Sequence, residues 1–334
     1  MSDAAVNLTT RYLGLELASP IVVGSCGLTD SVEGVLACEK AGAGAVVLKS
    51  VFEEQIAAEV GQLIDAAEDP FWHAEAADYI ATYGAENAVN DYLNLIKGCK
   101  KAATIPVIAS INCSTAKGWS KFAQQVEQAG ADALELNIFV PPSDPERTGA
   151  DVEKVYFDVL AEVKKAVSIP VALKVGSFFS SLGQMLVKLS TRGADGLVLF
   201  NRFYAPDIDI DRFQVVAGPA LSSAEEMSLT LRAVAQLSGW VEGDIAATTG
   251  IHDGKGVIKQ LLAGATVVQV ASTLYRNRVD YIATMLDEVR AWMQEKKFTR
   301  LENFRGKMNQ RAWPEGAAYD RVQFMKRSVH ADQY

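Results

Sequence analysis

Two lysines stand directly behind short apolar segments, where a charged side chain needs a partner or a ligand. Lys49 follows Val46-Val47-Leu48, and Lys174 follows Ala172-Leu173. Burying an unpaired ammonium group is costly, so chance placement is a poor explanation for both. One explanation is an ion pair with a nearby carboxylate such as Glu135. The other is an anionic ligand, which would need such local positive charge because the whole chain has a net charge of −9.

Amide and hydroxyl residues end the other apolar segments in the same way. They are Ser25, Ser50, Asn112, Asn137, Asn201, Thr248, Thr249, Gly250, Ser272 and Thr273. The groups at 248–250 and 272–273 offer hydroxyls and backbone amides, which bind phosphate, although turn chemistry alone would explain either one. Together with two lysines, they predict an elongated phosphorylated cofactor.

A repeated join between helix and strand indicates how these residues are positioned. Residues 41–48, 129–136, 192–199 and 263–270 each place a glycine before a short apolar segment. Glycine suits the left-handed position that ends a helix. An apolar run of this length is typical of a strand buried on both faces of a parallel sheet.

Further segments raise the predicted strand count to eight. Residues 104–110 and 168–174 share an Ile-Pro start, and 20–24 and 244–248 complete the set. Helical patterns lie between them, as in 122–129. Eight alternating units predict an α/β fold, a (β/α)₈ TIM barrel, whose strand ends converge on one face. No G-x-G-x-x-G motif follows the first strand, which disfavours a dinucleotide-binding sheet.

Two segments exceed a minimal barrel. Residues 51–103, after the second strand, are rich in aromatic and amide residues and predict a lid over the cofactor. Residues 202–221, after the sixth strand, alternate in hydropathy and predict an extra strand or hairpin over the barrel mouth. We expect one barrel domain over residues 1–309, binding the cofactor, and a C-terminal extension over 310–334.

Composition excludes several classes of protein. Hydrophobic residues make up 49% of the chain and charged residues 22%, yet no run approaches the ~18 apolar residues of a membrane span. The N-terminus lacks a signal pattern, so we expect a cytoplasmic protein. The four cysteines show no C-x-x-C spacing, so no metal site is indicated. The negative net charge argues against nucleic acid or an anionic membrane as the main partner.

In order along the chain, several of these segments resemble the dihydroorotate dehydrogenase family of FMN barrels, in its class 1-like form. The matching segments are 20–25, 44–50, 135–137, 172–175, 249–251 and 263–270. Each motif is weak alone, but their order at successive strands is specific. The resemblance runs from about residue 11 to residue 307, and residues 51–103 are its least similar part.

The resemblance implies FMN as the cofactor and assigns its contacts. These would be Gly24, Ser25, Lys49, Ser50, Asn112, Asn137, Lys174, Asn201, Gly218, Thr249, Gly250, Ser272 and Thr273. Lys174 would lie beside the flavin N1/O2 edge, where a fixed ammonium stabilises the charge left by hydride transfer. Lys49 would lie near both flavin and substrate as a catalytic residue. At Thr249-Gly250 and at Ala217-Gly218, one glycine of a family pair is replaced.

The substrate half departs from the family. After the fourth strand, family members have Asn-x-x-Cys-Pro-Asn, or Ser for Cys, and that residue is the base. This chain has Asn137-Ile138-Phe139-Val140-Pro141-Pro142, so Val140 replaces the base. The family's Asn-x-x-Gly-x-x-Asn stretch is also missing. Ser143 is a weak substitute for the base. The further candidates, each with a simpler structural role, are Cys26, His73, Tyr79, Tyr83, Cys113 and His252.

The resemblance therefore implies an FMN-dependent oxidoreductase acting on CH–CH groups, with hydride transfer between a dihydropyrimidine-like substrate and flavin N5. Dihydroorotate, and so pyrimidine biosynthesis, is the family default. The alternatives are a Schiff-base lyase acting on a phosphorylated sugar through a barrel lysine, and a flavin-binding barrel without dihydroorotate turnover. We expect a homodimer. No cysteine cluster suggests an iron–sulfur centre, so we expect electrons to leave through a second small substrate or a partner protein. Which of these is the electron acceptor stays open.

Overall fold

Eight parallel strands form a closed barrel in the computed structural model, which describes residues 6–52, 88–113, 119–140, 143–203 and 205–320. The barrel strands are β3 (Ile21–Val23), β4 (Ala45–Val47), β6 (Val107–Cys113), β7 (Ala133–Ile138), β8 (Val171–Val175), β9 (Gly196–Leu199), β12 (Asp244–Thr248) and β13 (Val267–Val270). The sheet order is β4-β3-β13-β12-β9-β8-β7-β6, and β4 also pairs with β6, which closes the ring. The predicted barrel and its strand positions are confirmed.

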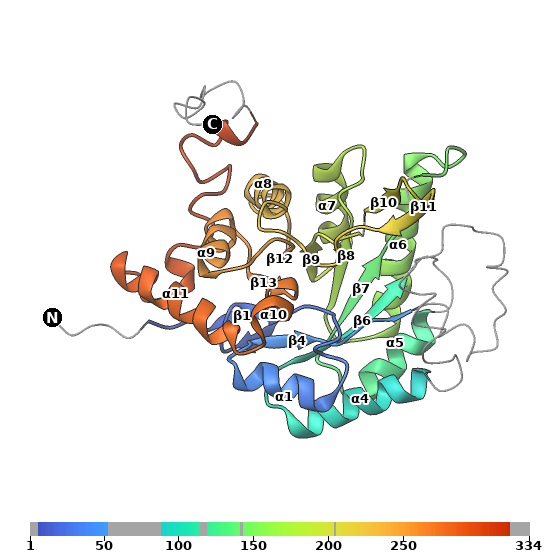
Figure 1. Ribbon diagram of the computed structural model, residues 1–334, viewed down its shortest axis with the longest axis horizontal. Coiled ribbons are helices and arrows are strands. Elements are labelled where there is room, and N and C mark those ends of the chain that lie inside the picture. The colour runs from blue at the N-terminus through green and yellow to red at the C-terminus, as the bar shows by residue number, and fades with distance from the viewer. Residues whose placement is uncertain (1–5, 53–87, 114–118, 141–142, 204, 321–334) are drawn as a thin grey trace.

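Helices alternate with the strands and surround them (Figure 1). They are α1 (Val32–Lys40), α4 (Ala88–Ala102), α5 (Trp119–Gln128), α6 (Gly149–Ala166), α7 (Leu182–Thr191), α8 (Met227–Leu237), α9 (Gly254–Ala263), α10 (Ser272–Asn277) and α11 (Tyr281–Glu295), with a short 3₁₀ turn, η2 (Leu301–Asn303). Their buried faces pack on the outer faces of the strands in one large apolar core. The outer face of the barrel wall is therefore apolar, as expected of strands covered by helices.

The repeated glycines adopt the left-handed conformation that their positions predict. Gly42, Gly130, Gly193 and Gly264 have φ values of 98°, 97°, 102° and 117°. Each lies just after a helix and before a barrel strand, where a side chain would strain the backbone. The repeat seen in the sequence is therefore a repeated turn that sends the chain from helix to strand.

A hairpin that the sequence did not indicate closes the lower end of the barrel. β1 (Thr10–Tyr12) pairs with β2 (Leu15–Leu17), and the tip residue Leu13 donates its backbone N–H to Asp244 Oδ2 at 2.7 Å. Tyr12 and Leu13 pack into an inner cluster with small strand residues such as Ala133 and Val267. The hairpin therefore fills the amino-terminal end of the barrel interior with apolar side chains.

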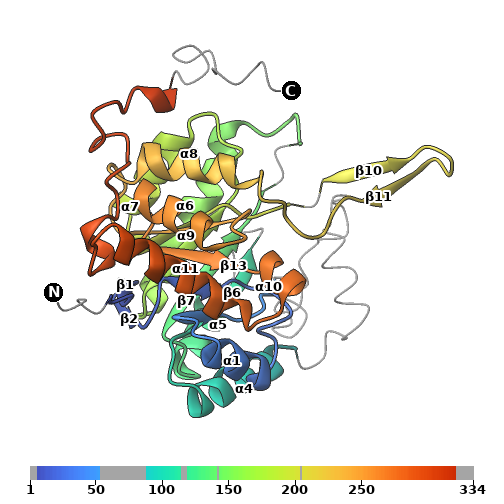
Figure 2. The same cartoon turned by 60° about the vertical axis from the view of Figure 1, so that its left-hand side comes forward.

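The predicted hairpin after the sixth strand is present, but it does not fold across the mouth. β10 (Pro206–Asp209) and β11 (Gln214–Ala217) pair antiparallel and extend away from the barrel (Figure 2). Within the insertion after the second strand, β5 (Val51–Phe52) pairs with β6, and α4 packs against α1. Residues 53–87, which include His73, Tyr79, Tyr83 and Asn87, lie outside the described residues, so the predicted lid stays a prediction.

Residues after η2 run along the outside of the barrel. Gln310 donates its backbone N–H to Ala235 O at 2.7 Å, and the Arg311 guanidinium stacks over the Trp240 ring at 4.5 Å. In the described part of the chain, no helix is long and apolar enough to cross a membrane. The same residues contain no group of three or more His, Cys, Asp or Glu side chains arranged to hold a metal ion.

Candidate active site

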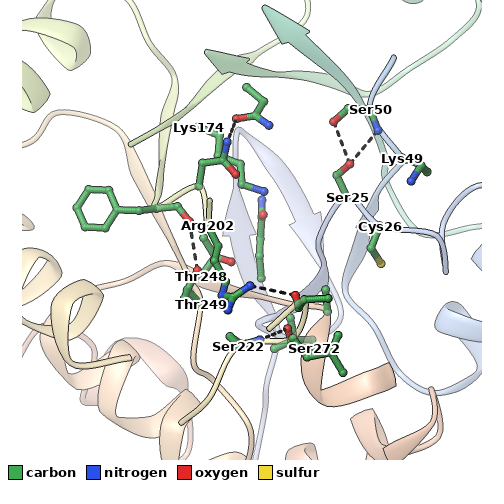
Figure 3. Close-up of a pocket in the computed structure, with 18 of the residues that line it drawn as sticks. Ser25, Cys26, Lys49, Ser50, Lys174, Arg202, Ser222, Thr248, Thr249 and Ser272 are labelled. Carbon is green, nitrogen blue, oxygen red and sulfur yellow. Dashed lines mark hydrogen bonds between the residues drawn. The ribbon is translucent and has the colours of Figure 1, made fainter. Parts of the chain in front are cut away.

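A cavity of about 440 Å³ opens at the carboxyl ends of the barrel strands. Among its lining residues are Ser25, Cys26, Lys49, Ser50, Phe52, Asn112, Asn137, Lys174, Asn201, Arg202, Ser222, Thr248, Thr249, Gly250, Gln269, Ser272 and Tyr275. Figure 3 shows the serine and lysine side chains that follow β3 and β4 on one side and Lys174 across from them, with Arg202 near the middle and Ser222 and Ser272 below it. Its volume is in the range of small-molecule and cofactor sites.

The alternation of strand residues explains why polar groups meet here. Ala133, Glu135 and Asn137 are two residues apart on β7, so they point to the same side, and Ala133 belongs to the inner cluster. By the same rule, Lys174 lies one step above the inner residue Ala172. A polar layer therefore sits on the apolar layer inside the barrel.

Lys174 lies at the base of the cavity in an ion pair. Its Nζ is 3.7 Å from Glu135 Oε1, and the two side chains are 12% and 1% exposed. The other carboxylate oxygen, Oε2, accepts a 2.6 Å hydrogen bond from Gln269 Nε2. The ion pair that the sequence left as one explanation is present, but the lysine also lines the cavity.

Amide and hydroxyl groups form two further hydrogen-bonded sets. Asn201 Nδ2 donates to Asn137 Oδ1 at 2.8 Å, which joins the ends of β7 and β9. The Ser50 and Ser25 hydroxyls are 3.0 Å apart, and Ser50 Oγ is 2.8 Å from the buried Ser110 Oγ. These bonds fix the orientation of the cavity wall before any ligand binds.

The ends of β12 and β13 form the side with backbone amides and small hydroxyls. Gly250 has φ of +75°, and a Cβ there would lie 2.2 Å from Met227 N. Thr249 also has a positive φ, 74°, where the sequence comparison places a family glycine. Ser222 donates its backbone N–H to Ser272 Oγ at 3.0 Å, while its own Oγ lies 3.3 Å from His252 Nε2. Burial and the nearby Arg276 lower the pKa of His252.

Arg202 was not predicted as a site residue. Its Nε donates to Glu226 Oε2 at 2.8 Å, and its terminal nitrogens donate to Ala220 O and Pro219 O at 3.0 and 2.9 Å. The arginine therefore anchors the segment that leads to Ser222 while adding positive charge to the cavity wall. It directly follows the strand-end residue Asn201, so strand position could have identified it.

Cys26 and Tyr275 form a second pair at the rim. Burial raises the pKa of the Cys26 thiol, although the Tyr275 hydroxyl and the charges of Lys174 and Lys49 oppose that rise. Burial, with Cys26 beside it, raises the pKa of Tyr275 to about 12. Both groups therefore hold their protons near neutral pH.

Four predicted residues are not among those lining the cavity. Gly24 is buried behind it, and Thr273 turns its hydroxyl to His252 O at 3.0 Å. Gly218 lies at the base of the β10–β11 hairpin, where a Cβ would lie 2.3 Å from Ala205 O. Ser143 is exposed on the loop after β7. The other predicted cofactor contacts all line the cavity.

Val140, at the expected position of the base, is buried rather than presented to the cavity. It is 4% exposed, and its backbone N–H is a hydrogen-bond partner of the Tyr156 hydroxyl, whose pKa is raised to about 12 by burial against the effect of that bond. The adjacent Phe139 stacks on Phe203 with ring centroids 3.8 Å apart. This loop is therefore held by apolar packing.

Comparison with known proteins agrees with this architecture. A family model described as dihydroorotate dehydrogenase matches residues 7–293. A Thermoplasma volcanium protein named dihydroorotate dehydrogenase B (NAD(+)), catalytic subunit, is 26% identical over 316 residues, covering 92% of this chain and 98% of its own. Proteins of the same name from Methanocaldococcus jannaschii and Pyrococcus furiosus are 26% and 25% identical, covering 87% and 90% of this chain and 95% and 98% of theirs.

The family model spans most of the chain, and the barrel places the predicted lysines and amides around one cavity. The chain therefore belongs to the dihydroorotate dehydrogenase family, whose members are flavin-dependent oxidoreductases acting on CH–CH groups.

Proposed function

We propose that this protein binds FMN in the cavity at the carboxyl ends of its strands and oxidises or reduces a dihydropyrimidine-like substrate there. The observation that carries the proposal is Lys174 at the base of the cavity, across from the amides and hydroxyls that follow β12 and β13. A cationic group and a phosphate-type site on one cavity match the two polar ends of FMN. Family membership gives no support to a Schiff-base lyase.

The residues present fit this cofactor. Gln269 Oε1 is buried and has no hydrogen-bond partner among the described residues, although Gln269 lines the cavity. The phosphate would lie by Gly250 and Ser272, near Ser222, and the N1/O2 edge by Lys174. FMN, when bound, would supply hydride-accepting chemistry at N5. Lys174, whose ammonium is already held at the base of the cavity, would stabilise negative charge at the N1/O2 edge without reorganising.

Among the described residues that line the cavity, none is suited to accept the proton that leaves the substrate. The described lining residues include no carboxylate and no imidazole, and the thiol of Cys26 and the phenol of Tyr275 have raised pKa values. A positioned base is worth about 10²–10⁴-fold in rate. We therefore propose that dihydroorotate is oxidised slowly and that a substrate needing no such base reacts faster.

The test has two steps. Purified protein is loaded with FMN, and the absorbance spectrum and the ratio of flavin to protein are measured; a ratio well below one after gel filtration argues against the cofactor. Stopped-flow reduction of the bound flavin by dihydroorotate, by NADH and by dihydropyrimidines then ranks the substrates. Rapid reduction by dihydroorotate would show that the base lies elsewhere.

The oligomeric state and the cellular location of the protein are also open to test. We propose a homodimer in the cytoplasm, supported by the resemblance to the dihydroorotate dehydrogenase family. Light scattering of the full chain measures the oligomeric state.

A further inference from the structure

A carboxylate lies inside the barrel where the fold alone does not require one. Glu135 points inward from the middle of β7, directly above the apolar layer, and is 1% exposed. A charge buried to this degree persists only with partners, and replacing such a group by an apolar one is often neutral or stabilising. Its presence therefore points to a role beyond packing.

The partners of Glu135 come from two other strands. Gln269 Nε2, on β13, donates to Oε2 at 2.6 Å, and Lys174 Nζ, on β8, lies 3.7 Å from Oε1. In the sheet order β13 and β7 are separated by β12, β9 and β8, so Gln269 reaches Glu135 across the barrel interior. The three side chains form one buried set, the Glu135–Gln269–Lys174 triad, at the base of the cavity.

The triad is not fully satisfied. Glu135 Oε1 accepts no hydrogen bond from any described residue, and neither does Gln269 Oε1. A distance of 3.7 Å is too long for a hydrogen bond, so Glu135 attracts the ammonium without taking up one of its N–H donors. Lys174 is thereby held at the cavity floor with donors left for a ligand above it.

The charges of Glu135 and Lys174 shift the pKa values of groups below and above the triad. Below it, burial first and then the charge of Glu135 raise the pKa of the Tyr12 phenol. Above it, the charge of Lys174 acts against the rise that burial causes in the pKa of Cys26. The two ions therefore present opposite charges to the floor of the barrel and to the cavity.

We propose that Glu135, oriented by Gln269, is a positioning residue that fixes Lys174 and offsets its charge, and so sets the reduction potential of the bound flavin. This inference rests on the proposed function. An ammonium without a counter-ion would favour the reduced, more negative flavin strongly. With the carboxylate behind it, the same ammonium favours reduction less.

The experiment measures the reduction potential of FMN-loaded protein against a reference dye. Glu135→Gln keeps the size and removes the charge, so the equilibrium should shift about tenfold toward reduced flavin, or about 30 mV for a two-electron couple. Glu135→Asp keeps the charge but draws it away from Lys174, so the shift should have the same sign and be smaller.

Gln269→Met tests the orienting role with an opposite expectation. The carboxylate then loses its donor and pairs more closely with Lys174, so the equilibrium should move about threefold away from reduced flavin. Gln260→Met is the matched control, because Gln260 is also a fully buried glutamine whose amide has no partner among the described residues, and it lies on α9 outside the cavity lining. The reduction potential of FMN bound to the Gln260→Met variant should equal that of the unaltered protein.

The outcomes separate the two proposals. An unaltered protein that binds no flavin overturns the proposed function and this inference with it. Bound flavin whose potential is the same in Glu135→Gln as in the unaltered protein overturns the inference alone. If the reduction potential shifts in the same direction in Gln269→Met and in Gln260→Met, the change reflects a general disturbance of the core, and the inference fails. If Glu135→Gln does not fold, the opposite shifts expected of Glu135→Asp and Gln269→Met decide the question.

Discussion

Two regions leave the same face of the barrel with opposite character. The ends of β8, β12 and β13 carry a lysine, backbone amides and hydroxyls around one cavity. The loop after β7 instead buries Val140 and stacks Phe139 on Phe203. The first region fits the anionic cofactor proposed above, whereas Phe139 and Val140 of the second are side chains that cannot accept a proton. If the proposed function holds, we expect that cofactor binding and proton transfer can be altered separately.

The largest effect should come from removing the cavity cation. Lys174→Met should lower the rate of flavin reduction by about 10²–10³-fold, because the ammonium no longer stabilises charge at the N1/O2 edge. Lys164→Met is the matched control, since Lys164 pairs with Asp195 at 2.6 Å outside the cavity. Flavin content and stopped-flow rates are the measurements. If the rate of flavin reduction falls equally in both variants, the effect of Lys174 does not come from its position in the cavity.

A backbone change at the phosphate side should come next. Gly250→Ala combines a positive φ with a Cβ placed 2.2 Å from Met227 N, so the free energy of unfolding should fall by about 3 kcal/mol and FMN affinity should fall with it. Gly130→Ala has a positive φ but its nearest neighbour is 3.8 Å away, so it isolates the conformational cost, about 1 kcal/mol. Denaturant titration and FMN titration measure both. A Gly250→Ala protein no weaker than Gly130→Ala would contradict the close packing.

Much of this structure could be predicted because its signals are local. The glycine joins and apolar runs determine the barrel strands, and the two-residue period places strand-end residues such as Lys174 on the cavity. The β1–β2 hairpin was missed because its three-residue strands carry too little pattern. The contact of Gly218 with FMN stays a prediction, and the close approach of Ala205 O gives this position a second reason to be glycine.

Long-range geometry explains most of what the sequence did not indicate. Gln269 meets Glu135 only across the closed barrel, and no spacing along the chain encodes that contact. The backbone of Val140 is hydrogen-bonded to Tyr156 of α6, which lies sixteen positions further along the chain. Cys26 was discounted as a packing residue, and its pairing with Tyr275 follows from the fold rather than from sequence distance.

The pH dependence of stability tests the environment of His252, which lies beside the proposed phosphate site. Burial and Arg276 hold the pKa of His252 below its unfolded value of about 6.5. Above pH 6.5 both states are neutral and the contribution is fully present; as pH falls through the folded pKa, the unfolded state binds the proton more readily and stability is lost. His252→Gln should flatten this acid slope relative to the unaltered protein. Identical slopes from pH 7.5 to pH 5 would contradict the shift.

The smallest expected effect concerns the loop after β7. Restoring the family residue with Val140→Cys should change flavin reduction by dihydroorotate less than about threefold, because position 140 is 4% exposed and does not line the cavity. A thiol buried there would have a raised pKa and would be a poor proton acceptor. Ser143→Ala should likewise have little effect, since Ser143 is exposed. Stopped-flow reduction of the FMN-loaded variants provides the measurement. An acceleration of about 10²-fold in Val140→Cys, the lower end of the range for a positioned base, would mean that this loop reaches the substrate and that the two regions are not separate.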